Sequence, residues 1–281
     1  MAVEIADTIA HMRAERARLN GSVGVVPTMG ALHEGHLALI RAAHRDNDAV
    51  VVTIFVNPTQ FNDPRDLAAY PRDTEHDLDL LRSEHVDVVF MPLPDEMYSA
   101  TFQTYVTVEQ VARGLEGAHR PGHFRGVATI VAKLLNLTQP HRAYFGQKDA
   151  QQVAVIRQMI ADLNIPVDMV VCPTVRESDG LAMSSRNRRL SPTQREAAPV
   201  LYRALQAAVA VYEAGERDSR KLRRVMRDVL TTEPLAEIDY VSVADAKSLK
   251  EFEGLMDHPA LLSLAARIGP VRLIDNLVLP G

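Results

Sequence analysis

The feature that most constrains the fold is an alternation of two kinds of segment through the first 175 residues. Short runs of β-branched residues are followed by longer stretches in which apolar residues recur every three or four positions. This alternation predicts a parallel sheet, because parallel strands need crossover connections and helices supply them. The strands contain few polar residues, which indicates burial on both faces. The predicted strands are 23–26, 50–56, 86–91, 142–145 and 167–172, and the predicted helices are 36–45, 73–83, 126–137 and 151–163.

The character of the chain changes after Pro173. A polar segment rich in Arg and Ser, residues 176–190, leads to a strong helix start. Ser191 can cap the helix, Pro192 suits its first position, and Gln194 can complete a capping box. A second structural unit is therefore expected to begin near this point.

This second unit is expected to combine helices with an antiparallel sheet. Helices are predicted over 193–214 and 219–231, and Pro199 can kink the first of them because it lacks an N–H. Strand-like runs follow at 238–243, 261–268 and 271–278. The fold class is thus α/β: a Rossmann-like, doubly wound domain over residues 1–174 and a smaller α+β lid domain over residues 175–281.

Composition and charge exclude several classes of protein. A protein with a net charge of −5 and a pI near 6.1 does not attract the phosphate backbone of a nucleic acid, so no nucleic-acid partner is expected. A single cysteine, Cys172, permits no intramolecular disulfide and fits a reducing cytoplasm. Residues 1–21 lack a signal-peptide apolar block and are interpreted as a first helix, and the longest apolar run, 49–56, is far short of the roughly 20 residues of a membrane span. We expect a cytoplasmic protein without a membrane partner.

The strongest local motif is VGVVPTMGALHEGH, residues 23–36, in which a buried strand passes through a turn into a helix. Open α/β sheets bind ligands at the carboxyl ends of their strands, and free N–H groups at a helix N-terminus suit phosphate. His33 and His36 lie on one face of the first helical turn, where each can donate to a phosphate oxygen. The alternative is that both are surface or capping residues, and the strand-turn context favours a phosphate site.

Two further loops carry groups suited to a nucleotide. In FGQKD, residues 145–149, Lys148 can neutralise phosphate and Asp149 suits a ribose diol. The alternative is a turn with a solvated Lys–Asp pair. In LAMSSRN, residues 181–187, Arg186 is the natural partner of the β- and γ-phosphates, although Ser/Arg segments are also common linkers.

Neutral amides follow the second predicted strand in FVNPTQF, residues 55–61. Gln60 both donates and accepts, so it suits a hydroxyl or a carboxylate rather than phosphate. The alternative is an Asn-Pro turn with a bystander glutamine, and Gln152 faces the same choice. Asp77, on a predicted helix, is a weaker candidate that could reach magnesium through water.

PTMGALHEGH, FVNPTQF, YPRD, HFRGV, FGQKD and VRESDGLAMSSRN together resemble pantothenate synthetases, a family of the His-x-Gly-His nucleotidyltransferase superfamily. The motifs span most of the first 190 residues in the family's order. Ala150 and Gln147 are mild departures from the family pattern. The resemblance implies that ATP activates pantoate as an adenylate, that β-alanine then displaces AMP to give pantothenate, and that magnesium accompanies ATP in a homodimeric enzyme.

The resemblance also implies roles for individual residues. His36 matches the proton donor, with His33, Lys148 and Arg186 as further catalytic groups. Gln60, Gln152 and, more weakly, Asn57 correspond to pantoate contacts, and Gln60 also to a β-alanine contact. Two other functions stay open: nucleotidyl transfer to a phosphorylated small alcohol, and a non-catalytic nucleotide-binding module. The positions matching ATP-binding segments are Met29, Gly30, Ala31, Leu32, His33, Glu34, Gly35, His36, Gly146, Gln147, Lys148, Asp149, Val175, Met183, Ser184, Ser185 and Arg186.

Overall fold

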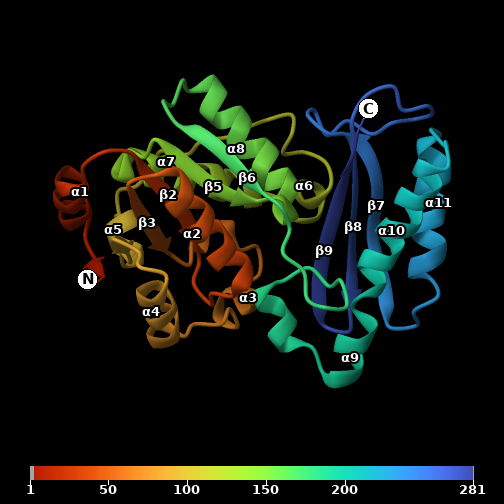
Figure 1. Ribbon diagram of the computed structural model, residues 1–281, viewed down its shortest axis with the longest axis horizontal. Helices are drawn as coiled ribbons and strands as arrows, with labels where there is room; N and C mark the ends of the chain where they lie inside the picture. The colour runs from red at the N-terminus through yellow and green to blue at the C-terminus, as the bar shows by residue number, and fades with distance from the viewer. Residues whose placement is uncertain (1–2, 281) are drawn as a thin grey trace.

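Two sheets of different construction organise the chain, and the computed structural model describes residues 3–280 (Figure 1). The first is a six-stranded sheet in which every strand pairs in parallel, in the order β1-β4-β3-β2-β5-β6. This confirms the predicted parallel α/β domain. Its strands are β1 (Glu4–Ala6), β2 (Val23–Thr28), β3 (Ala49–Ile54), β4 (Val88–Phe90), β5 (Arg142–Gly146) and β6 (Asp168–Cys172).

The strand order reverses beside β2. From β2 the chain proceeds outward to β3 and β4 on one side, whereas β5 and β6 lie on the other side. A crevice forms at such a reversal, because the connections leaving the two strands diverge to opposite faces of the sheet. The loops that follow β2 and β5 therefore border the natural binding site of this sheet.

Alternate residues of the central strands pack into two separate hydrophobic cores, one on each face of the sheet. Val25 and Val51 pack with α7 and α8, whereas Val26 and Val52 pack with α2 on the other face. This explains why the strands contain almost no polar residues. The helices and 3-10 turns of this domain are α1 (Ile9–Arg18), α2 (Glu34–Asp46), η1 (Pro58–Gln60), α3 (Pro64–Ala68), α4 (Thr74–Ser83), α5 (Pro94–Met97), α6 (Glu116–His119), α7 (His123–Thr138), η2 (Gln147–Asp149) and α8 (Ala150–Asp162).

The start of the chain differs from the prediction of one continuous helix. Residues Glu4–Ala6 form β1, which pairs with β4 at the edge of the sheet, and α1 begins only at Ile9 with Thr8 as its cap. A three-residue edge strand has too little sequence pattern to show its pairing partner, because that partner lies more than 80 residues away.

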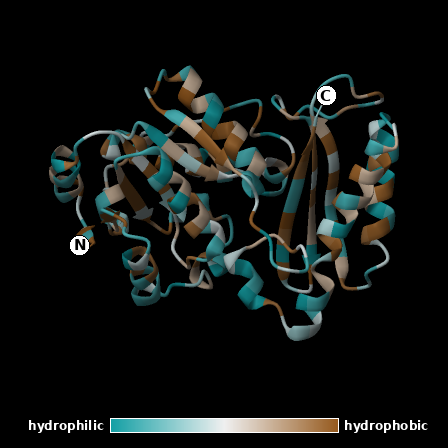
Figure 2. Cartoon of the chain, viewed as in Figure 1, coloured by the Kyte–Doolittle hydropathy of each residue, from teal (hydrophilic) through white to brown (hydrophobic). Residues whose placement is uncertain are grey.

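The second sheet is antiparallel and belongs to the C-terminal part of the chain. Its strands β7 (Ala236–Asp245), β8 (Ala260–Ile268) and β9 (Val271–Leu279) pack with helices that share one apolar core. Figure 2 shows α10 and α11 as alternating hydrophilic and hydrophobic bands, as expected for helices with one buried face. The remaining elements are η3 (Ser185–Arg189), α9 (Pro192–Ala197), α10 (Val200–Glu213) and α11 (Ser219–Leu230).

Local signals in this region behave as their chemistry predicts. Ser191 and Gln194 form the expected capping box with Pro192 at the first helical position. The helix predicted over 193–214 is interrupted at Pro199, so that α9 and α10 are separate. The domain boundary at residues 174 and 175 stays a prediction. Within residues 3–280, no helix is long and apolar enough to span a membrane.

Candidate active site

A cavity of about 220 Å³ lies at the crevice beside β2 and β5. The turn after β2, the loop after β3, the loop after β5 and the segment after β6 all contribute to its wall. Segments far apart in the sequence thus surround one space. The predicted site residues that line it are Met29, His33, Gly35, His36, Asn57, Gln60, Gly146, Lys148, Asp149, Gln152, Val175, Met183, Ser184, Ser185 and Arg186.

Some predicted residues have other partners and are not part of this wall. Glu34 pairs with Arg41 at the surface, and the Gln147 amide donates to the side chain of Asn276. Glu34 and Gln147 do not line the cavity, so their assignment as ATP contacts stays a prediction. The others outside the wall are Gly30, Ala31, Leu32 and Asp77.

Asp77 holds the turn between β2 and α2. Its carboxylate accepts hydrogen bonds from the backbone N–H of Ala31 at 2.8 Å and of Leu32 at 2.7 Å, and the residue is only 1% exposed. Gly30 and Ala31 adopt φ values of +78° and +50°, and a Cβ at Gly30 would meet an Asp77 oxygen at 2.9 Å. The glycine is needed here because the left-handed conformation and the buried carboxylate leave no room for a side chain.

The structure thus shows that Asp77 supports the turn, and the approach to magnesium through water that the sequence suggested for it stays a prediction. Both carboxylate oxygens face N–H groups of the turn, and the carboxylate that borders the cavity is that of Asp149. Asp77 acts through the turn, by fixing the residues that precede His33.

We expect Asp77→Asn to weaken both the fold and ATP binding. An amide offers one acceptor and turns its NH2 group toward a backbone N–H, so the free energy of unfolding falls by about 1–3 kcal/mol. Displacement of the turn is expected to raise the KM for ATP about tenfold. Urea denaturation and initial rates measure the two effects. Asp79→Asn, on the exposed face of the same helix, is the matched control, and equal behaviour of the two variants would contradict the role.

His33 and His36 are both capping residues and cavity residues. The His33 ring accepts from the N–H of Gly35 at 3.2 Å, and Nδ1 of His36 accepts from the N–H of His33 at 3.3 Å. The ring centroids are 4.1 Å apart. Because each Nδ1 is an acceptor, each neutral ring carries its proton on Nε2. The two alternatives foreseen from the sequence, capping and phosphate binding, are thus compatible: one nitrogen caps and the other is free to donate.

Both imidazoles are held neutral. Burial, followed by the charges of Lys148 and Arg188, lowers the pKa of His33 to about 4. Burial, followed by His33 and Lys148, lowers the pKa of His36 to about 3. At neutral pH these residues are therefore uncharged N–H donors.

These lowered pKa values predict a loss of stability on mild acidification. In the unfolded chain each histidine takes up a proton below pH 6.5, whereas the folded protein resists protonation until about pH 4 or below. Stability should fall by on the order of 2 kcal/mol per histidine between pH 7 and pH 5, and the loss is complete below the folded pKa. Urea denaturation across this range measures it. His36→Gln should show a shallower pH dependence than the wild type, and an identical dependence would contradict the assignment.

Lys148 lies on η2 at the carboxyl end of β5. Its side chain is 18% exposed, and Nζ is 3.7 Å from Asp149 rather than closely paired. The side-chain amide of Asn276, on β9, donates to the carbonyls of Gln147 at 3.0 Å and Lys148 at 2.8 Å, and accepts from the Gln147 amide at 3.0 Å. The C-terminal sheet thus fixes the backbone that carries Lys148, a contact that sequence reasoning missed.

The segment after β6 folds back over the same cavity. Met183 donates its N–H to the carbonyl of Val175, and Arg176 forms an ion pair with Asp275 of β9 at 2.6 Å. Arg186 pairs with Asp66 at 3.3 Å, and Arg189 shares the same carboxylate. Arg186 is the residue that the sequence analysis assigns to phosphate binding. Because its guanidinium is paired with Asp66 here, a phosphate group must compete with Asp66 for it.

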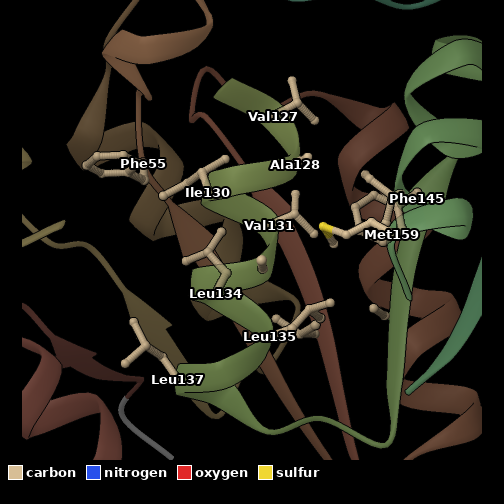
Figure 3. Close-up of a cluster of buried hydrophobic side chains, with 14 of the residues drawn as sticks. Phe55, Val127, Ala128, Ile130, Val131, Leu134, Leu135, Leu137, Phe145 and Met159 are labelled. Atoms are coloured by element: carbon tan, nitrogen blue, oxygen red, sulfur yellow. The ribbon is translucent and has the colours of Figure 1, made fainter. Parts of the chain in front are cut away.

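The other end of the cavity is amide-lined and apolar. The Asn57 amide donates to Oε1 of Gln60 at 2.9 Å, which leaves the Gln60 NH2 group 3.0 Å from the sulfur of Met29. Helix α7 supplies an apolar wall that the sequence analysis did not assign to the site. Figure 3 shows Ile130 directed toward Phe55, and both side chains line the cavity.

Comparison with known proteins identifies the family. Residues 4–278 match the model described as Pantoate-beta-alanine ligase. The chain belongs to this family. A pantothenate synthetase of Roseiflexus castenholzii is 60% identical over 97% of this chain and 98% of its own length. The crystal structure of a pantothenate synthetase from Thermus thermophilus has a TM-score of 0.93 at 47% identity, covering 98% of this chain and 99% of that one.

A third relative is described as a complex with ligands. The pantoate-β-alanine ligase of Francisella tularensis, described as complexed with β-γ ATP and β-alanine, is 37% identical with a TM-score of 0.81 and covers 99% of this chain and 98% of its own. Family membership shows this chain to be a ligase of pantothenate biosynthesis. It therefore decides against the two functions left open by the sequence, a nucleotidyltransferase acting on a phosphorylated alcohol and a non-catalytic module.

Proposed function

We propose that this ligase joins pantoate to β-alanine through a pantoyl-adenylate formed in the cavity beside β2 and β5. The observation that carries the proposal is that two kinds of group line this one cavity. The first comprises N–H donors and cations from three segments, His33 and His36, Lys148, and Arg186, and the second comprises the neutral amides Asn57, Gln60 and Gln152 together with apolar residues of α7. A triphosphate suits the first group, and a small acid with hydroxyl and methyl groups suits the second.

The reaction requires positioning and charge neutralisation more than a protein nucleophile. In the first step a pantoate carboxylate oxygen bonds to the α-phosphorus of ATP, and the bond to pyrophosphate breaks. The Nε2–H groups of His33 and His36 and the Lys148 ammonium are proposed to stabilise the charge that develops on the phosphoryl oxygens. In the second step the neutral amine of β-alanine bonds to the acyl carbon, the bond from that carbon to the phosphate oxygen of AMP breaks, and the proton lost by the amine nitrogen passes to solvent.

We further propose that magnesium accompanies ATP, and that the enzyme is a cytoplasmic homodimer. The Asp149 carboxylate lines the cavity, and it would hold a magnesium ion that enters with ATP. Magnesium would neutralise part of the charge on the departing pyrophosphate.

The adenylate route predicts a partial reaction that can be measured alone. Pantoate and ATP, without β-alanine, should support exchange of labelled pyrophosphate into ATP. Addition of β-alanine should then release AMP and pantothenate in equal amounts. Pyrophosphate exchange that requires β-alanine would refute the adenylate route, and release of ADP instead of AMP would also refute it.

A further inference from the structure

A second and larger cavity adjoins the proposed adenylation site. It has a volume of about 680 Å³ and lies between the two sheets, where residues of α6 and β9 face each other. Lys148, Asp149, Ser184 and Arg186 line both cavities, so the two spaces meet at these residues. The larger cavity is therefore a route by which a second substrate can approach an acyl group formed in the smaller one.

The wall of this larger cavity is rich in charged residues, nearly all of them paired. Six of its seven Lys and Arg residues lie within 4 Å of a carboxylate, although Lys148 and Arg267 are only loosely paired, at 3.7 and 3.8 Å. Arg120 is the exception among the residues that the structure describes. It directly follows α6, and its guanidinium faces the cavity without an acidic partner.

Arg120 is nevertheless held in place. Its Nη1 lies 3.2 Å from Nε2 of His123, and its Nη2 donates to the backbone carbonyl of Gln60 at 3.3 Å. Nδ1 of His123 lies 2.7 Å from the same carbonyl, so it carries the ring proton, and Nε2 accepts from Arg120. A guanidinium has five N–H donors, and two are used here. The remaining donors of Arg120 have no partner among residues 3–280.

The surroundings favour an anion at this point. Burial, followed by the nearby charge of Arg186, lowers the pKa of Arg120 to about 10, and the more weakly acting carboxylates of Glu116 and Asp66 offset only part of this shift. The group is still cationic at neutral pH but is poorly solvated. A carboxylate that takes up the unused N–H groups would relieve both the desolvation and the repulsion. A bidentate pair with a carboxylate is the geometry for which a guanidinium is best suited.

We propose that Arg120 binds the carboxylate of the amine substrate, and so determines that an amino acid rather than a simple amine is joined to the acyl group. The proposal rests on the ligase function proposed above. Gln60 connects the two parts of the site, because its side chain lines the adenylation cavity while its carbonyl holds Arg120 and His123. The acidic end of the substrate is thereby fixed beside the cavity in which its amine must react.

Arg120→Gln tests the assignment, because glutamine is neutral and polar. Pantoate-dependent pyrophosphate exchange, measured without β-alanine, should stay within about threefold of the wild type, since no amine takes part in it. The KM for β-alanine should rise about 30- to 100-fold, the effect of removing one partner of a desolvated charge pair. The wild type should strongly prefer β-alanine to its neutral amide, 3-aminopropanamide, and this preference should nearly vanish in the variant. Arg125→Gln, which removes an exposed guanidinium on α7, is the matched control and should keep the preference.

Three outcomes would overturn the proposal. The first is an unchanged preference for β-alanine over its amide in Arg120→Gln. The second is an equal loss of exchange and of the complete reaction, which would show that Arg120 acts by supporting Gln60. The third is a fall in melting temperature large enough for unfolding at the assay temperature to account for the lost activity. Absence of exchange in the wild type would instead refute the adenylate route.

Discussion

Replacing His36 by alanine is expected to lower turnover about 100- to 1000-fold, the usual cost of removing one preorganised donor from a developing oxyanion. The ring is half-buried, is neutral at pH 7, and carries its proton on the nitrogen that is free to face the cavity. The KM for ATP should change less than turnover, because the charge that His36 opposes grows in the transition state. Pyrophosphate exchange and steady-state rates measure the two quantities.

A second substitution at the same position separates chemistry from folding. Glutamine at the third helical position is a good capping partner, so His36→Gln should keep the cap on α2. It also retains an N–H donor near the position of Nε2, and should therefore recover part of the activity lost in His36→Ala. His76→Ala, at an exposed site on α4, serves as the control for loss of a histidine. Full activity of His36→Ala with an intact fold would refute the proposed role.

Sequence reasoning succeeded where the deciding forces are local. The capping box at Ser191, the interruption at Pro199 and the alternation of strands and helices all depend on residues a few positions apart. The meeting of the His33 turn with the Lys148 loop followed from one topological rule, because both loops leave carboxyl ends of parallel strands.

What the sequence did not show depends on contacts between distant segments. Asp77 lies 45 residues beyond Leu32, and only the packing of α4 against the turn places its carboxylate on two N–H groups. The same holds for Asn276, which is 128 residues from Lys148. No periodicity or spacing encodes such pairs, so an acid or an amide on a predicted element has many equivalent interpretations until the elements are packed.

Replacing Lys148 by alanine should reduce pyrophosphate exchange about 1000-fold or more. Its ammonium is largely buried, is not closely paired, and lies near the two histidines, where charge on the transferred phosphoryl group must be neutralised. In such a poorly solvated site a cation stabilises developing charge far more than in water. Lys148→Arg keeps the charge but not the shape, and should recover only part of the rate. Lys133→Ala, outside the cavity wall, is the control. A loss confined to the KM for β-alanine would contradict this role.

The position of Lys148 is itself set by the other sheet, and this dependence can be measured. Asn276→Ala removes the hydrogen bonds to the carbonyls of Gln147 and Lys148, and should lower exchange about tenfold, because small displacements of a charged group are costly. If Asn276 acts through Lys148, it should have little further effect once Lys148 is alanine, so that the two losses are far from additive. Additive losses would mean that Asn276 supports the site by another path. This double-mutant cycle therefore tests whether β9, which contributes no residue to the wall of the smaller cavity, affects the reaction in that cavity.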